Sequence, residues 1–124
     1  MAKSVADVVL DAALDYIKNN VTQEAVCSAE PTTYAEATST YKLALKTGLT
    51  SGSFTGPANG DTSGRKVTVN QQATITVDTS GTAVYVALCS ATVLLYVTTC
   101  TSQALTAANT VTVPAWDIEI ADPS

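Results

Sequence analysis

Residues 82–97 read TAVYVALCSATVLLYV, and this stretch decides the fold class. The segments 82–89 and 93–97 are apolar on both faces, and residues 90–92 between them are typical of a tight turn. Strands that are buried on both faces read as continuous apolar runs. We therefore expect a hairpin of two central strands, each covered on both sides.

Shorter segments around this hairpin alternate apolar and polar residues, which is the pattern of strands with one buried face. They are residues 65–69, 73–77, 110–113 and 116–120, with Pro114 marking an edge or a bulge, and upstream residues 41–46, preceded by a short strand at 25–27. The 21 threonines and 14 valines are β-branched and suit pleated strands. The sequence predicts a mainly β protein, a β-sandwich or partly closed barrel of six to eight short strands.

The N-terminal residues predict one α-helix over about residues 4–19, beginning with a capping box made by Ser4 and Asp7. Its apolar stripe consists of Val5, Val9, Ala12, Ala13, Tyr16 and Ile17, with Leu10 and Leu14 beside them, and its polar stripe of Asp7, Asp11, Asp15 and Lys18. Carboxylates four residues apart on one helix point along a line and do not converge on a cation. We therefore expect the acidic stripe to be a solvated face.

Residues 48–64 hold five of the six glycines and predict a long exposed loop. They lack the Gly-Lys-Ser/Thr ending of a phosphate-binding loop. Because long loops are commonly functional, we expect partner contacts there. Residues 30–36 read as a turn that leads into one capped helical turn.

Composition narrows the class of partner. A chain of 124 residues with 46% hydrophobic and 14% charged residues predicts one folded domain. With 11 acidic residues against 6 basic ones, it lacks the basic density that binds nucleic acid or anionic membranes. Acidic residues interrupt any secretory leader, and the longest apolar run, residues 83–89, is too short for a membrane helix. We expect no nucleic acid and no membrane partner, and synthesis in the cytoplasm.

Catalytic chemistry is also not expected. The chain has no histidine, which excludes a histidine base or a histidine metal ligand. It has a single arginine, Arg65. Asp117 and Glu119 form the nearest carboxylate pair, and we expect both to be solvated. Cys27, Cys89 and Cys100 match no metal or redox motif and favour buried thiols, although a Cys89–Cys100 disulfide remains open. We predict no enzyme activity, no metal and no cofactor.

The order of segments resembles a family of small tailed-bacteriophage proteins encoded among virion genes. The resemblance lies in residues 9–17 (VLDAALDYI), 27–37 (CSAEPTTYAEA), 64–69 (GRKVTV), 82–88 (TAVYVAL) and 118–123 (IEIADP). It implies a virion component similar to capsid decoration or cement proteins, which sit on the outer shell and stabilise the head. The implied partners are the major capsid protein or other virion proteins, and further copies of the chain, as a homo-oligomer that we expect to be a trimer.

Two other functions remain open. One is a tail, neck or fibre-anchor protein of the virion, and the other is a carbohydrate-binding adhesion module, since β-sandwiches often stack sugars on aromatic side chains. The helix at residues 5–18 and the loop at 48–64 are the expected places of partner contact, unless the helix merely caps the sheet. The candidate contact residues are Val5, Val9, Tyr16, Phe54 and Trp116.

Overall fold

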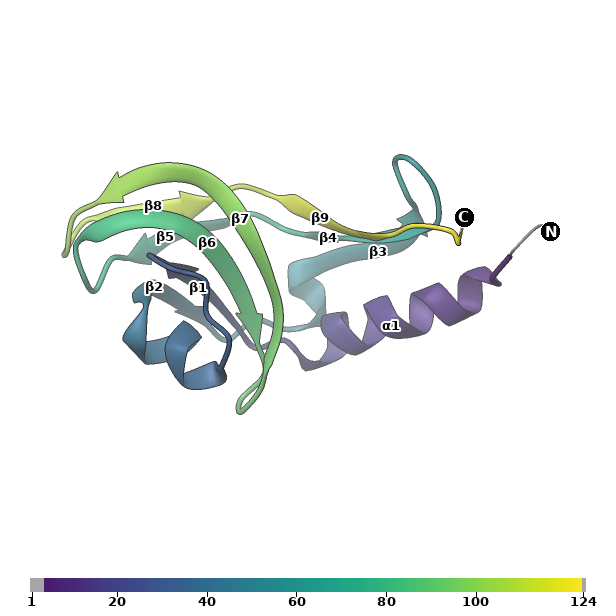
Figure 1. Ribbon diagram of the computed structural model, residues 1–124, viewed down its shortest axis with the longest axis horizontal. Helices are drawn as coiled ribbons and strands as arrows, with labels where there is room; N and C mark the ends of the chain where they lie inside the picture. Colours follow the sequence, from purple (N-terminus) through teal and green to yellow (C-terminus); the bar gives the residue numbers. More distant parts are fainter. Residues whose placement is uncertain (1–3, 124) are drawn as a thin grey trace.

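Nine β-strands in three antiparallel sheets and one α-helix make up residues 4–123, the part of the chain that the computed structural model describes (Figure 1). The elements are α1 (Asp7–Asn20), β1 (Gln23–Cys27), β2 (Lys42–Thr47), β3 (Phe54–Asn59), β4 (Arg65–Val69), β5 (Gln72–Thr76), β6 (Gly81–Cys89), β7 (Leu94–Leu105), β8 (Thr110–Val113) and β9 (Trp116–Ile120). Two short helical turns, η1 (Glu36–Thr40) and η2 (Ser51–Ser53), complete the set. The predicted mainly β sandwich with one N-terminal helix is confirmed. The predicted number of six to eight strands is too low, because β3 forms within the segment expected to be a loop.

The sandwich is joined along one side and open along the other. One layer has the strand order β2-β1-β6-β7, and the other contains β5-β8 with the sheet β3-β4-β9 continuing beyond it. A bridge between Ala44 and Val77 joins β2 to the end of β5, and the Asp78 amide donates to the Leu43 carbonyl at 2.7 Å. No strand pairing within residues 4–123 connects β7 to β8 or β9. The sheets therefore do not close into a barrel.

Three groups of buried side chains hold the layers together. The first lies between the two layers and comprises Val26, Leu43, Ala44, Ile75, Val77, Ala83, Val86, Leu105 and Val113. The second lies between α1 and the β3-β4-β9 sheet and comprises Leu14, Val21, Leu49, Phe54, Val67, Val69, Leu88 and Ile118. The third comprises Ala25, Cys27, Ala37, Ala87 and Cys89, and includes a residue of η1. Each apolar sheet face is thus covered by another element, as the alternation in the strands requires.

The hairpin of β6 and β7 forms as expected, but only β6 is a central strand. The Ser90 amide donates to the Val93 carbonyl at 2.9 Å and closes the turn. β6 pairs with β1 on one side and β7 on the other, whereas β7 pairs with β6 alone. The prediction of a second central strand over residues 93–97 is therefore wrong. Apolar residues on both faces reflect packing above and below the sheet, and they do not determine whether a strand has neighbours on both edges.

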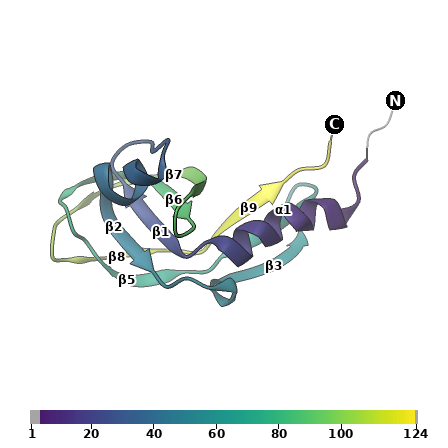
Figure 2. The same cartoon turned by 90° about the horizontal axis from the view of Figure 1, so that it is seen from below.

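The helix begins later than predicted, and the face that packs against the sheet is not the one through Val9. It starts at Asp7, and Ala6 occupies the N-cap without a side-chain hydrogen bond, so the expected capping box with Ser4 is absent. Leu10 and Leu14 face the sheet and are buried. The apolar stripe through Val9 is left exposed. The helix lies along β3 and the β4-β9 side of the molecule (Figures 1 and 2).

The glycine-rich segment 48–64 is more ordered than the loop that the sequence predicts. It contains η2 and β3, and Phe54 at the start of β3 is only 5% exposed. Gly64 has a φ of +67°, and a side chain there would collide with the carbonyl of Ile120. Glycine at this position allows the turn to pass closely over β9. The smaller prediction of a capped turn near Glu36 is confirmed, because the Glu36 amide donates to Thr33 Oγ1 at 3.1 Å and η1 follows.

Candidate functional site

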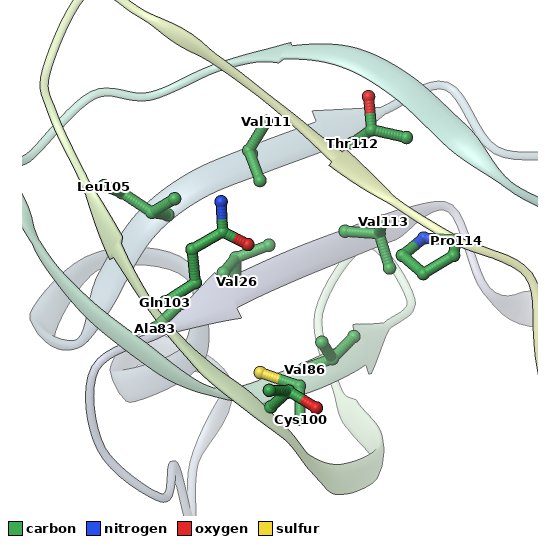
Figure 3. Close-up of a pocket in the computed structure, with 11 residues that line it drawn as sticks. Val26, Ala83, Val86, Cys100, Gln103, Leu105, Val111, Thr112, Val113 and Pro114 are labelled. Atoms are coloured by element: carbon green, nitrogen blue, oxygen red, sulfur yellow. The ribbon is translucent and has the colours of Figure 1, made fainter.

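Two adjoining hollows follow the open side of the sandwich, between β7 and the segment that connects β8 to β9 (Figure 3). Their volumes are about 200 and about 350 Å³. Both are lined by Val86, Cys100, Thr101, Val113 and Pro114. We call the two together the open-side groove. It exists because β7 arches over β8 without pairing with it (Figure 1).

The side chains of the open-side groove suit binding better than chemistry. Its lining includes the buried apolar side chains of Val26, Leu105 and Val113, and Gln103 lies near Val26 (Figure 3). Burial raises the pKa of the Cys100 thiol, which leaves little of the thiolate that a nucleophile requires. Within residues 4–123 no three His, Cys, Asp or Glu side chains are grouped to hold a metal ion. The groove therefore offers shape and apolar surface rather than acid, base or nucleophile.

Asp117 is the one charged side chain on the groove, and its charge is already compensated. Its carboxylate accepts hydrogen bonds from Thr68 Oγ1 at 2.7 Å and from Lys66 Nζ at 3.4 Å. These donors, the threonine first, lower the pKa of Asp117 below its ordinary value. Asp117 is thus a structural anion at one end of the groove. The prediction of a merely solvated carboxylate missed both contacts.

The free edge of β7 carries no charge along its length. β7 has 12 residues, Leu94–Leu105, and no charged side chain occurs anywhere between Asp78 and Asp117. Residues 99 and 101–104 are exposed. Natural edge strands are usually short, or protected by lysine, proline or bulges, because a bare edge pairs with other chains. β7 has no lysine or proline, although its register with β6 is irregular between Thr99 and Gln103. A long uncharged edge is therefore a candidate assembly surface, and the absence of charge over residues 79–116 is the sequence signal that would have revealed it.

A second apolar surface lies on α1, and we call it the helix stripe. Val8, Val9 and Tyr16 are 71%, 58% and 59% exposed, and Ala12 and Ala13 between them are exposed as well. These residues recur at steps of three and four and so share one helix face. The face points away from the sheet because Leu10 and Leu14 occupy the opposite side. The stripe is an apolar surface of the kind that a partner covers.

The five candidate contact residues fall in three different places. Val9 and Tyr16 lie together on the helix stripe, and Val5 lies just before the helix and is half-buried. Phe54 packs in the core and presents no surface contact. Trp116 is partly buried beside the open-side groove, with its ring 5.8 Å from that of Tyr96. The indole N–H of Trp116 is buried without a hydrogen-bond acceptor, so the tryptophan acts mainly as an apolar wall.

Glu24 is a buried carboxyl group that the sequence reading did not single out. Its side chain is 0% exposed on β1, and neither carboxyl oxygen has a hydrogen-bond partner in the described structure. It stands opposite Lys46 on β2 and Leu88 on β6. Burial raises the pKa of Glu24 to about 7, because a charge without partners is costly away from water. A single acidic residue in an otherwise apolar strand does not by itself indicate that its side chain is buried without hydrogen-bond partners.

Glu119 also has a structural role. Its carboxylate accepts hydrogen bonds from the amides of Asp61, Thr62 and Ser63 at 3.0, 3.1 and 3.2 Å. These amides lower the pKa of Glu119. The contact fastens the 60–64 turn onto β9. Asp117 and Glu119, the nearest carboxylate pair in the sequence, are therefore each held by contacts within the fold.

The three cysteines are free thiols. Cys27 and Cys89 are buried, and Cys100 on β7 is half-buried. The register of β6 and β7 sets Cys89 opposite Leu94, away from Cys100. The disulfide that the sequence left open is therefore absent.

No helix in the described part of the chain is long and apolar enough to cross a membrane. Comparisons with protein-family models, with curated proteins and with solved structures each gave no match.

Proposed function

We propose that the chain is a non-enzymatic structural protein of a tailed-bacteriophage virion, and more specifically a capsid decoration protein that stabilises the head. The observation that carries the proposal is the long uncharged free edge of β7 beside an apolar groove. Such an edge is a hazard to a protein that acts alone, because it invites pairing with other chains. It is useful to a protein whose function is to be built into an assembly.

The helix stripe supports the same proposal. A protein that cements a shell needs at least two contact surfaces, one for the shell and one for a neighbour. The helix stripe and the open-side groove are made by different elements, and α1 lies toward one end of the molecule and β8 toward the other (Figures 1 and 2). We assign the helix stripe to the major capsid protein, because its apolar residues Val9 and Tyr16 are unpartnered.

The virion setting comes from the resemblance of the segment order to small tailed-phage proteins. The absence of histidine and the structural use of Asp117 and Glu119 support a non-enzymatic role. The more specific part of the proposal is that the chain lies on the outer surface of a capsid. A tail, neck or fibre-anchor position is its alternative within the virion.

Quantitative mass spectrometry of purified particles tests this function. A capsid decoration protein is expected in a number comparable to that of the major capsid protein, since it follows the capsid lattice. A copy number equal to that of the tail proteins would contradict the decoration role and support a position in the tail. Absence from particles that contain all other virion proteins would overturn the virion proposal.

A further inference from the structure

We propose that Asn59 is a site of spontaneous covalent modification, at which the side-chain amide is lost by deamidation and a carboxylate takes its place. Asn59 is the last residue of β3, and Gly60 follows it at the start of the turn that connects β3 to β4. Of the five asparagines in the chain, it is the only one that precedes a glycine. The inference concerns the chain by itself and does not depend on the proposed function.

The reaction needs only water and hydroxide. The backbone nitrogen of Gly60 loses its proton to hydroxide and attacks the side-chain carbon Cγ of Asn59. A bond forms between this nitrogen and Cγ, the bond between Cγ and Nδ2 breaks, and the amide nitrogen takes up a proton and leaves as ammonia. A cyclic succinimide remains as the covalent intermediate. Water then opens the ring at Cγ to give aspartate, or at the backbone carbonyl carbon of Asn59 to give isoaspartate.

The fold itself requires the glycine that makes Asn59 reactive. A side chain at position 60 would collide with the carbonyl of Ser63 and would begin only 2.9 Å from the carboxyl group of Glu119. Glycine is therefore needed for the chain to make this turn. Because glycine has no Cβ, no side chain beside its nitrogen hinders the attack on Cγ. The other four asparagines precede bulkier residues and lack this advantage.

Arg65 activates the side chain that is attacked. Its Nη1 donates to Asn59 Oδ1 at 2.8 Å, and the two residues also stand opposite each other in the pairing of β3 with β4. The guanidinium withdraws electrons from the amide carbonyl, and it stabilises the negative charge that develops on Oδ1 as Gly60 attacks. The side chain of Asn59 is exposed, so water and hydroxide reach it.

The turn controls the rate, because it holds the attacking nitrogen. The Gly60 amide donates to the Gly64 carbonyl at 2.9 Å, which keeps its proton in place. The amides of residues 61–63 donate to the carboxylate of Glu119. Gly60 attacks only when this turn opens locally. Glu119 is therefore a positioning residue that protects Asn59 by keeping the turn closed.

The new carboxylate changes the contacts of Arg65, which already pairs with Asp11 on α1 at 2.8 and 3.3 Å. A carboxylate at position 59 accepts the same guanidinium and repels Asp11, so the ion pair with the helix weakens. In an Asn59→Asp variant, which has the charge of the product, Asp11→Asn should therefore lower the midpoint of thermal unfolding less than it does in the unmodified protein. An equal or larger decrease would overturn this link to α1.

Mass spectrometry of the wild-type protein after incubation at mildly alkaline pH tests the modification directly. Each event replaces an NH₂ group by OH and raises the mass by about 1 Da. The tryptic peptide 47–65 contains Asn59 as its only asparagine, so the gain is expected there, divided between aspartyl and isoaspartyl forms that chromatography separates. Asn109 is the internal control, because it is also exposed but precedes Thr110. A peptide 47–65 that keeps its mass, or an Asn109 that reacts as fast as Asn59, would overturn the proposal.

Two variants then test the mechanism. Asn59→Gln should abolish the gain in peptide 47–65, because the ring that a glutamine closes is larger and forms far more slowly. Glu119→Gln should open the turn more often and make the reaction at Asn59 faster by about fivefold. The matched control, Glu30→Gln, removes an exposed carboxylate elsewhere and should leave the rate unchanged. A rate in Glu119→Gln no faster than that of the wild type would overturn the control by the turn.

Discussion

Arg65 Nε on β4 lies 2.8 Å from Asp11 Oδ1 on α1, and this ion pair orients the helix on the sheet. Arg65 Nη2 lies 3.3 Å from the second carboxylate oxygen, so the contact is bidentate. The acidic face is thereby drawn toward β4. The helix then buries Leu10 and Leu14, and the apolar stripe with Val9 and Tyr16 points outward.

This orientation predicts different costs for two apolar truncations on the same helix. Leu14 is 0% exposed, so Leu14→Ala should lower the free energy of unfolding by about 2–5 kcal/mol through the cavity it leaves. Val9 is 58% exposed, so Val9→Ala should change it by less than about 0.5 kcal/mol. Urea unfolding followed by circular dichroism measures both. A larger loss for Val9→Ala than for Leu14→Ala would contradict the helix orientation.

The ion pair itself predicts that Asp11→Asn destabilises the protein more than Asp15→Asn does. Asp11 accepts the guanidinium of Arg65, whereas Asp15 makes no ion pair among residues 4–123. Both variants remove one carboxylate from the same helix, so their difference isolates the contact with Arg65. The midpoint of thermal unfolding is the measurement. Equal midpoints would show that the ion pair does not contribute to stability.

Glu24 predicts a dependence of stability on pH near neutrality. Its pKa of about 7 in the fold lies above the ordinary value of 4.5, so the folded state holds this proton more tightly than the unfolded state. The stability that the proton contributes is complete below pH 4.5, decreases as the pH rises toward 7, and is lost above pH 7. A shift of this size corresponds to about 3 kcal/mol.

Glu24→Gln should remove that decrease, because the amide does not titrate. The experiment measures the free energy of unfolding of the wild type and the variant between pH 4.5 and pH 8, and compares their slopes. The chain has no histidine, so no imidazole titrates in the same range. The matched control, Glu30→Gln, changes an exposed carboxylate and should keep the wild-type slope. A variant of Glu24 with an unchanged slope would show that this carboxyl is not the titrating group.

The carboxylate of Glu119 predicts the order of the 60–64 turn. Because it accepts three consecutive backbone amides, Glu119→Gln should weaken their protection without unfolding the sandwich. Hydrogen exchange at Asp61, Thr62 and Ser63 should become faster, while exchange in β6 stays slow. Unchanged exchange at these three amides would mean that the turn is ordered by other contacts.

Changes in the helix stripe should abolish binding to capsids without unfolding the protein. This prediction rests on the proposed function. Val9→Lys combined with Tyr16→Ser should leave the folded protein intact, since both side chains are exposed, and should abolish its binding to undecorated heads. Thr76→Lys on β5 adds the same charge at an exposed position outside the helix stripe and should bind normally. Co-sedimentation with heads measures this. Full binding by the double variant would exclude the stripe as the capsid contact.

The strands were the most predictable part of the fold. Alternation of apolar and polar residues correctly indicated residues 65–69, 110–113 and 116–120, because one face of each of these strands packs against the core. β3 was missed, since Gly56 and Pro57 resemble a loop while Phe54 anchors the strand in the core. A lone aromatic residue inside a glycine-rich segment is the available signal for such an anchor.

The candidate surfaces were less predictable than the strands. α1 has apolar residues on more than one side, and periodicity alone could not tell whether the stripe of Val9 or that of Leu14 faces the sheet. Arg65, which lies far along the chain, pairs with Asp11 and adds to the burial of Leu10 and Leu14 in favouring this orientation. β7 resembled a central strand because side-chain patterns report the two faces of a sheet and say nothing of its edges. The buried state of Glu24 likewise arises from neighbours on β2 and β6 that local sequence does not reveal.

Cryo-electron microscopy of intact virions shows where this chain is located and so distinguishes a capsid position from a tail position. A decoration protein should give density for the β-sandwich repeated over the outer capsid lattice, with α1 against the major capsid protein. Density confined to the tail, or particles without density for this fold, would contradict the decoration role.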